Sequence, residues 1–191
     1  VNITAVKANP FVSIEYNNLN ISTHLIGLYN SNNINAALTI GKYFNVADLD
    51  IKTALESYIP ENNRSQLLTK GTNEIILDAY NANPSSMAVA IANFIQLENP
   101  NKVMILGDMF ELGNESEFEH KSLISSLLKE EAICYFIGAA FFANKVDKNN
   151  FFFYKTFDDF SNYLKENKMD NSIVLIKGSR GMALERTLEF L

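Results

Sequence analysis

Hydrophobic and polar residues follow different patterns in the two parts of this chain. Residues 1–28 contain short apolar runs typical of β-strands, separated by polar residues. Residues 34–44 then carry apolar side chains at helical spacing, and Asp48 is placed to cap a second helix that ends before Pro60. This part of the pattern predicts the end of a sheet followed by two helices.

A regular alternation of apolar strands and amphipathic helices follows the polar segment "ENNRSQ", residues 61–66. We expect strands at 74–78, 102–107, 132–138, 151–154 and 172–177, and helices at 85–97, 115–130, 140–146, 158–167 and 182–190. The strands are too apolar to have a solvated face, so helices should cover both sides of a mostly parallel sheet. The predicted fold class is α/β, with a Rossmann-like doubly wound domain over residues 64–191 and a separate domain over residues 1–63.

Composition excludes several classes of partner. A formal net charge of -6 offers no basic surface for nucleic acid. Cys134 is the one cysteine, which excludes a disulfide framework and favours a reducing, cytoplasmic setting. No apolar segment approaches the roughly 20 residues needed to span a bilayer. His24 and His120 are far apart in the sequence, and no cysteine or acidic cluster completes a metal site with either of them.

The segment "GLYNSNNINAA" places Asn30 and Asn33 on one side of the first turn of a helix. Carboxamides at this spacing can donate to and accept from a purine edge, which is what adenine recognition needs. Helix capping is the alternative for the same asparagines, because Asn is a preferred N-cap residue.

Arg64 lies in the polar segment, and Asp78 ends a predicted strand. An arginine fork suits a phosphate, and a carboxylate at a strand end suits a ribose hydroxyl. The alternative for Arg64 is an ordinary surface arginine, whose ion pairs contribute little to stability.

The segment "NANPSSM" contributes Asn81, Asn83, Pro84 and Ser85. Proline near a helix start, preceded by asparagine, signals a helix entry whose unpaired N–H groups point toward the strand ends. Those groups can hold a carboxylate, so this segment is a candidate binding site for an anionic ligand.

The segment "IKGSRGM" follows the last predicted strand and contributes Lys177, Gly178, Ser179 and Arg180. Two cations and a hydroxyl beside glycines, which permit close backbone approach, suit an anionic ligand. An ordinary basic surface loop is the alternative.

Asp108 and Glu111, in "LGDMFELG", suit either a cation or amine ligand or simply a turn. No G-x-x-x-x-G-K-[ST] pattern is present, so these residues contain no P-loop to hold a triphosphate.

Taken together and in this order, these motifs resemble the Mur ligases. "GLYNSNNINAA" is similar to the Gly-x-His/Tyr-Asn-x-x-Asn segment that closes the ATP-binding central domain of that family. "DAYNANPSSM" and "LGDMFELG" resemble the forms found in the members that add D-alanyl-D-alanine, and "KGSRGM" completes the series. Tyr29 stands where many relatives have His, a variation that those members accept. The resemblance runs from residue 25 to residue 186.

The resemblance implies a reaction and a set of partners. Family members use ATP and magnesium to convert a substrate carboxylate to an acyl phosphate, which the amine of the incoming group attacks. Here the partners would be UDP-N-acetylmuramoyl-tripeptide and D-alanyl-D-alanine. Carried over position by position, the nucleotide residues would be Asn30, Asn33, Arg64 and Asp78. The acceptor residues would be Asn81, Asn83, Pro84, Ser85, Lys177, Gly178, Ser179 and Arg180.

The family's P-loop, magnesium ligands and modified lysine match nothing in this sequence. We therefore expect residues 1–63 to be the end of the central ATP-binding domain and residues 64–191 the acceptor domain, with no catalytic residue and no metal ligand in the chain. We expect the chain to be inactive by itself. Another Mur-type or folylpolyglutamate-type ligase would share the fold but should lack "YNANP". A regulatory nucleotide-binding module is the alternative outside the enzymes.

Overall fold

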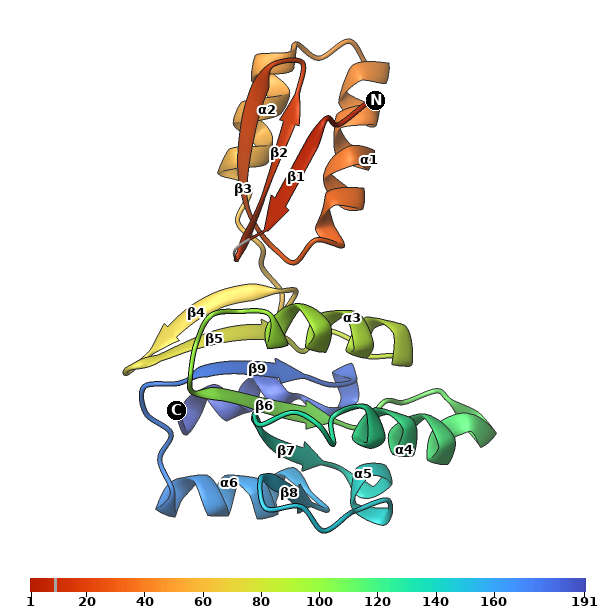
Figure 1. Ribbon diagram of the computed structural model, residues 1–191, viewed down its shortest axis with the longest axis vertical. Coiled ribbons are helices and arrows are strands. Elements are labelled where there is room, and N and C mark those ends of the chain that lie inside the picture. The colour runs from red at the N-terminus through yellow and green to blue at the C-terminus, as the bar shows by residue number, and fades with distance from the viewer. Residues whose placement is uncertain (9) are drawn as a thin grey trace. The chain divides into compact units, whose positions relative to one another are not determined.

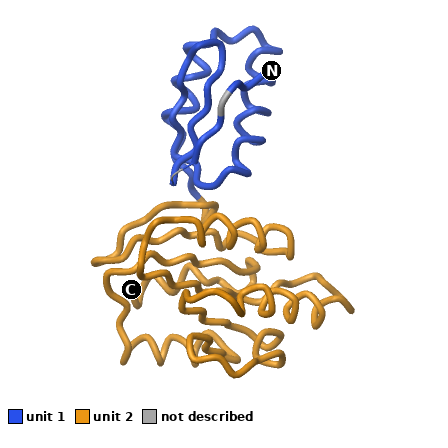
Figure 2. Tube along the Cα trace, viewed as in Figure 1, with its two compact units in different colours: residues 1–61 blue, residues 62–191 orange. Residues whose placement is uncertain are grey.

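The computed structural model describes residues 1–8 and 10–191, which divide into two units, residues 1–61 and residues 62–191 (Figures 1 and 2). The change of sequence pattern places the boundary after residue 63, and the observed division falls after residue 61. Each unit has a hydrophobic core of its own.

The first unit is a three-stranded antiparallel sheet with two helices. Its elements are β1 (Ala5–Ala8), β2 (Phe11–Tyr16), β3 (Leu19–Ile26), α1 (Asn30–Tyr43) and α2 (Asp48–Ser57). Asn17 and Asn18 form the tight turn between β2 and β3 with φ of 46° and 58°, a conformation that asparagine tolerates better than most residues. The core of the unit consists of Val12, Ile14, Tyr16, Ile21, Ile34, Leu38 and Ile51.

The predicted cap at Asp48 is wrong. Ala47 occupies the N-cap position of α2, and no side chain caps this end of the helix. The Asp48 carboxylate instead lies 2.6 Å from Lys42 Nζ and accepts a hydrogen bond from Asn17 Nδ2 at 3.0 Å. The Lys42 ammonium holds the pKa of this carboxyl below its usual value. Asp48 therefore connects α2 to α1 and to the β2–β3 turn.

The second unit is built on a six-stranded sheet in the order β4-β5-β9-β6-β7-β8. Its strands are β4 (Gln66–Lys70), β5 (Asn73–Asp78), β6 (Lys102–Gly107), β7 (Ile133–Ile137), β8 (Phe151–Tyr154) and β9 (Ile173–Lys177). Only β4, at one edge, pairs antiparallel with its neighbour. The prediction of an α/β fold with a mostly parallel sheet is confirmed, but β4 was not predicted.

Helices cover both faces of this sheet (Figure 1). They are α3 (Pro84–Ile95), α4 (Ser116–Ser126), α5 (Ala139–Ala143) and α6 (Phe157–Glu166). On one face, Phe160 and Leu164 of α6 pack with alternate strand residues such as Ile105 and Ile176. On the other face, Phe136 of β7 contacts Phe141 of α5, with ring centroids 5.1 Å apart.

Two predicted helices differ most from the observed elements. The helix expected at 182–190 is a pair of 3₁₀ segments, η2 (Arg180–Met182) and η3 (Leu184–Glu189). Ala183, between them, is left-handed with φ of 48°, which ends any regular helix. The helix expected at 115–130 ends at Ser126, because the backbone then forms i→i−3 hydrogen bonds, such as that from Leu127 N to Ile124 O.

The strand register brings the polar motifs to one edge of the sheet. Asp78 is paired with Lys177 between β5 and β9, and Leu106 is paired with Lys177 between β6 and β9. The carboxyl ends of these parallel strands are where ligands bind in open α/β sheets. Among the helices that the structure describes, none has the length and apolar character required to cross a membrane.

Candidate functional site

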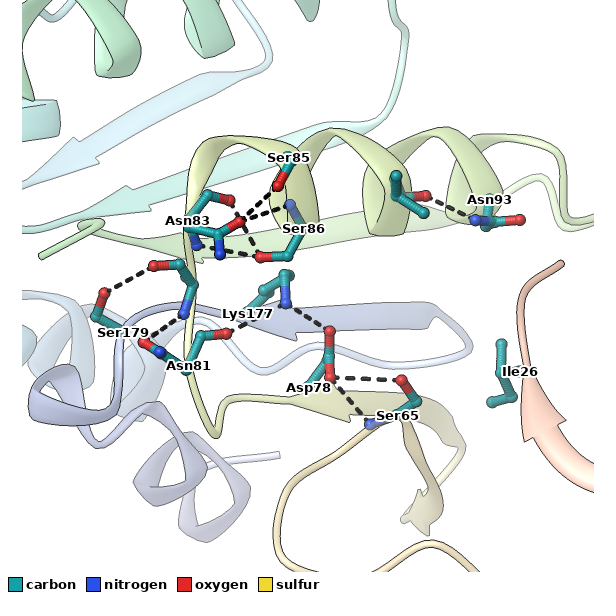
Figure 3. Close-up of polar contacts among 12 residues, drawn as sticks. Ile26, Ser65, Asp78, Asn81, Asn83, Ser85, Ser86, Asn93, Lys177 and Ser179 are labelled. Carbon is teal, nitrogen blue, oxygen red and sulfur yellow. Dashed lines mark hydrogen bonds and ion pairs between the residues drawn. The ribbon is translucent and has the colours of Figure 1, made fainter. Parts of the chain in front are cut away.

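A buried ion pair lies at the carboxyl ends of β5 and β9, in the middle of these polar motifs. Lys177 Nζ is 2.6 Å from Asp78 Oδ2 and also donates to the carbonyl oxygen of Asn81 at 3.3 Å (Figure 3). Lys177 is 2% exposed. Its ammonium therefore binds the protein's own groups, and little of it is accessible to a ligand.

The second oxygen of Asp78 binds the segment that leads into β4. Oδ1 accepts from the backbone N–H of Ser65 at 3.0 Å and from the Ser65 hydroxyl at 3.4 Å. Asp78 thus connects Lys177 with the residue that follows Arg64. The sequence pattern gave no indication of Ser65, because a serine in a polar segment is typical of any loop.

Arg64 is exposed and lies over the ring of Tyr80, with Cζ 3.9 Å from the ring centroid. The backbone N–H of Tyr80 donates to the carbonyl oxygen of Asn63 at 3.1 Å, which brings the two segments together. Stacking on an aromatic face orients a guanidinium while leaving its N–H groups accessible. Tyr80 is a residue that our sequence analysis missed, although it lies within "DAYNANP".

The predicted helix entry after β5 is confirmed. Asn83 is the N-cap of α3, and its Oδ1 accepts from the backbone N–H of Ser86 at 2.9 Å, while Pro84 is the first helical residue. The Ser85 hydroxyl also donates to Asn83 Oδ1, at 2.9 Å. Asn81 is exposed, and its Oδ1 accepts from the backbone N–H of Ala82. Capping therefore occupies the side-chain oxygen of Asn83.

Ser179 connects the loops that follow β5, β6 and β9. Its hydroxyl accepts from the backbone N–H of Phe110 at 2.7 Å and donates to the carbonyl oxygen of Ala82 at 3.3 Å. Its own N–H donates to the carbonyl oxygen of Asp108 at 3.1 Å. Ser179 is 3% exposed, so its hydroxyl forms hydrogen bonds within the protein and holds these loops together (Figure 3).

Gly178 and Arg180 complete the motif. A Cβ at Gly178 would lie 3.0 Å from the Cα of Gly107, so the absence of a side chain permits the close approach of the two loops. Arg180 Nη1 donates to Glu185 Oε1 at 2.8 Å, while the Arg180 side chain is 59% exposed. Of the motif "KGSR", Arg180 presents its charge to solvent and Lys177 does not.

Asp108 and Glu111 have different environments. Asp108 is 5% exposed, and its carboxylate accepts from the backbone N–H groups of Ala140 and Phe141 at 2.8 Å and 2.9 Å. It therefore fixes the start of α5. Glu111 is exposed in a left-handed turn with φ of 64°. Of the two alternatives, the structure favours the turn.

His120 is a buried packing residue. Its Nε2 accepts from the backbone N–H of Met109 at 3.0 Å, and its Nδ1 donates to the carbonyl oxygen of Ser116 at 2.6 Å. His24 is exposed and contacts the edge of Phe11. Within residues 1–8 and 10–191, no group of three or more His, Cys, Asp or Glu side chains could hold a metal ion.

In the first unit, Asn30 and Asn33 contact each other. Asn33 Nδ2 donates to Asn30 Oδ1 at 2.8 Å, and Asn30 Nδ2 donates to the carbonyl oxygen of Ile26 at 2.8 Å. The capping alternative is wrong for both residues, because Tyr29 occupies the N-cap position of α1. Asn30 is buried and Asn33 is exposed, so Asn33 is the more accessible of the two carboxamides.

Comparisons with known proteins identify the family of this chain. The model of the family "Mur ligase, glutamate ligase domain" matches residues 63–180. The UDP-N-acetylmuramoyl-tripeptide–D-alanyl-D-alanine ligase of Bacillus subtilis is 34% identical over 176 residues, which cover 87% of this chain and 38% of that protein. The protein of the same name from Rickettsia prowazekii is 30% identical over 136 residues, or 66% of this chain and 29% of that protein.

Solved structures share the fold of the whole chain. MurF from Acinetobacter baumannii superposes with a TM-score of 0.84 at 25% identity, covering 98% of this chain and 44% of that one. MurF from Thermotoga maritima, solved in complex with ADP, has a TM-score of 0.78 at 20% identity and covers 98% of this chain and 45% of that one, a likeness of fold. The chain spans less than half the length of these relatives. It belongs to the Mur ligase family, and residues 63–180 carry the glutamate ligase domain.

Proposed function

We propose that this chain is the C-terminal part of an ATP-dependent ligase that joins D-alanyl-D-alanine to UDP-N-acetylmuramoyl-tripeptide. The observation that carries the proposal is the alignment with the ligase of this name from Bacillus subtilis over 87% of the chain. The meeting of "YNANP" and "KGSR" at one sheet edge supports it, because both motifs are assigned to the acceptor. Residues 1–63 then belong to the ATP-binding domain and residues 64–191 to the acceptor domain.

On the acceptor side, Arg180 is the group best placed to bind the dipeptide carboxylate, because its guanidinium is accessible and charged. Lys177 and Ser179 hold the loop of Asn81 and Ala82 in position. In the proposed reaction the dipeptide amine attacks the carbonyl carbon of an acyl phosphate. The C–N bond forms, the C–O bond to phosphate breaks, and the amine loses a proton as inorganic phosphate leaves.

On the nucleotide side, we assign Asn30 and Asn33 to the adenine and Arg64 to the phosphates of ATP. The support for Arg64 is that Tyr80 orients its guanidinium while leaving it exposed. Asp78 acts by holding the segment of Arg64, since both its oxygens have partners within the protein. Mg²⁺ would accompany ATP, and the described residues include no group of three or more His, Cys, Asp or Glu side chains that could hold it.

Nuclear magnetic resonance of the ¹⁵N-labelled chain tests the acceptor proposal directly. D-alanyl-D-alanine should shift the amide signals of residues 81–83, 85–86 and 178–182, while L-alanyl-L-alanine should shift them far less. Equal shifts with both enantiomers, or none at tens of millimolar, would contradict the proposal. Larger shifts with L-glutamate would favour a folylpolyglutamate-type ligase.

Calorimetry with ATP distinguishes the ligase from a regulatory nucleotide-binding module. The sequence has no P-loop pattern, so the groups that surround the β- and γ-phosphates in P-loop enzymes are not supplied by these 191 residues. We expect the purified chain to bind ATP no more tightly than about millimolar and not to hydrolyse it. Micromolar binding would favour the regulatory module, and measurable turnover would contradict the assignment of domains.

A further inference from the structure

Phe110 is an exposed aromatic residue on a loop whose backbone is held firmly in place. It follows β6 and is 45% exposed. Its N–H donates to the Ser179 hydroxyl at 2.7 Å, and the preceding N–H, of Met109, donates to His120 Nε2 at 3.0 Å. Glu111, the next residue, is in a left-handed turn. The backbone on each side of this ring therefore has a defined conformation.

The groups that hold this loop are themselves buried. His120 is 0% exposed and Ser179 is 3% exposed. Burying polar groups has a desolvation cost, which hydrogen bonds to the protein only offset. Here those bonds fix the backbone of Phe110, while its ring remains in contact with water. The bonds therefore do not serve to pack this ring in the core.

The ring lies against the residue that follows the accessible arginine in the sequence. A Cβ placed on Gly181 would be 2.6 Å from Phe110 Cε2, so the ring packs directly on the glycine that follows Arg180. Glu185 accepts from one N–H group of the Arg180 guanidinium, and the side chain of Arg180 is 59% exposed. An apolar ring and the residue that carries an exposed guanidinium are thus separated by a single glycine at the carboxyl ends of β6 and β9.

We propose that Phe110 and Arg180 form the subsite for the terminal residue of the acceptor dipeptide, an inference that rests on the proposed function. In a terminal alanine the carboxylate and the methyl group are attached to the same carbon atom. Arg180 binds the carboxylate, and the ring of Phe110 contacts the methyl group. Phe110 thereby selects an acceptor with a small apolar side chain next to its carboxylate.

A pair of dipeptides that differ by one methyl group tests this subsite. The dissociation constants of D-alanyl-D-alanine and D-alanylglycine are measured by NMR titration of the chain. The wild-type chain should favour D-alanyl-D-alanine roughly 10-fold, the low end of what one methyl group contributes in an apolar site. Phe110→Ala should remove this preference, whereas Arg180→Ala should raise the dissociation constants of both dipeptides by a similar factor.

Two further variants separate the ring from the stability of the fold. Gly181→Ala leaves Phe110 in the sequence but forces its ring aside, and the backbone of Gly181 is not left-handed, so alanine is tolerated there. It should also reduce the preference for D-alanyl-D-alanine. Phe118→Ala is the matched control, because Phe118 is a 65% exposed phenylalanine on α4, and it should leave both constants unchanged.

The outcomes distinguish failure of this inference from failure of the proposed function. If Phe110→Ala weakens the binding of both dipeptides equally, or if the variant still prefers D-alanyl-D-alanine over D-alanylglycine, the ring is not part of the subsite. The proposed acceptor site is unaffected by that result. If neither dipeptide shifts any signal of the wild-type chain at tens of millimolar, the acceptor site itself is wrong and the subsite fails with it.

Discussion

Lys177 and Ser179 belong to a motif whose residue types suit an anionic ligand, yet both direct their polar atoms into the protein. Residue types along the sequence predicted that these motifs come together, because parallel strands place their carboxyl ends at one side of the sheet. They could not predict which cation remains accessible. The partner of Lys177 is Asp78, 99 positions away, and only the register of β5 against β9 brings them together.

The burial of this ion pair leads to a prediction for Lys177→Met. The substitution leaves the Asp78 carboxylate without its counter-ion, and breaking a buried pair in this way costs about 3 kcal/mol of unfolding free energy. Urea denaturation of the chain measures the loss. In the double variant with Asp78→Asn, the loss should be clearly smaller than the sum of the single losses, because the uncompensated charge is gone.

Lys42→Met is the control for this experiment. Lys42 also lies 2.6 Å from an aspartate, but its side chain is 39% exposed, so water replaces the lost contact and the change in stability should be small. Strictly additive losses in Lys177→Met and Asp78→Asn would show that the two side chains do not stabilise the fold as a pair.

Among the elements, strands that are continuously apolar were predicted best. The expected strands 102–107 and 151–154 have the observed bounds of β6 and β8. β4 was missed because "QLLTK" is short and mostly exposed at the sheet edge, so its sequence carries little of the apolar signal. The end of the chain was predicted as one helix because its apolar spacing is helical, and nothing in the sequence marks Ala183 as left-handed.

The strands β7 and β8 should make the fold sensitive to alkaline pH. Burial raises the pKa of Cys134 from 9.0 to about 12 and that of Tyr154 from 10.0 to about 12, and it also raises the pKa of Tyr135. The folded chain thus holds these protons more tightly than the unfolded chain. Their contribution to stability is complete below pH 9.0 and is lost as the pH rises from 9.0 toward about 12.

Urea midpoints of the second unit, measured between about pH 8 and pH 11, test this dependence. Cys134→Ala and Tyr154→Phe should each flatten the decline of stability with pH, because each removes a proton that only the unfolded state releases readily. A stability that stays level over this range would show that these groups are solvated in the folded state.

For the whole molecule, the motifs of the sequence predicted the family but not every residue that packs against them. The break at "ENNRSQ" is visible because strands and helices begin to alternate regularly after it. The motifs follow one another in an order that identifies the Mur ligases, and the family model confirms this over residues 63–180. Tyr80 and Phe110 were missed, because their importance comes from contacts with Arg64 and Gly181 that only the fold creates.

Because each unit has its own core, we expect the chain to unfold in two transitions. The first unit has 61 residues, and a domain of this size is only marginally stable because it buries a smaller fraction of its surface on folding than a larger domain does. Residues 1–61 should therefore unfold first and show the lower protection from hydrogen exchange. Leu38→Ala, at a fully buried position in the core of the first unit, should lower only the unfolding free energy of this first transition, by about 3 kcal/mol.

Leu175→Ala, at an equally buried position of β9, is the matched substitution in the second unit and should lower only the later transition. Hydrogen exchange followed by NMR assigns each transition to its residues, since amides of α1 should exchange through the first transition and amides of β6 and β9 through the second.

If Leu38→Ala shifted both transitions equally, the units would unfold as one cooperative body. The loss of residues 1–61 would then also disturb the sheet edge that carries Asp78 and Lys177, and a polypeptide of residues 62–191 should not bind the acceptor dipeptide. Separate transitions predict the opposite, namely that residues 62–191 alone retain the dipeptide-induced shifts of the whole chain.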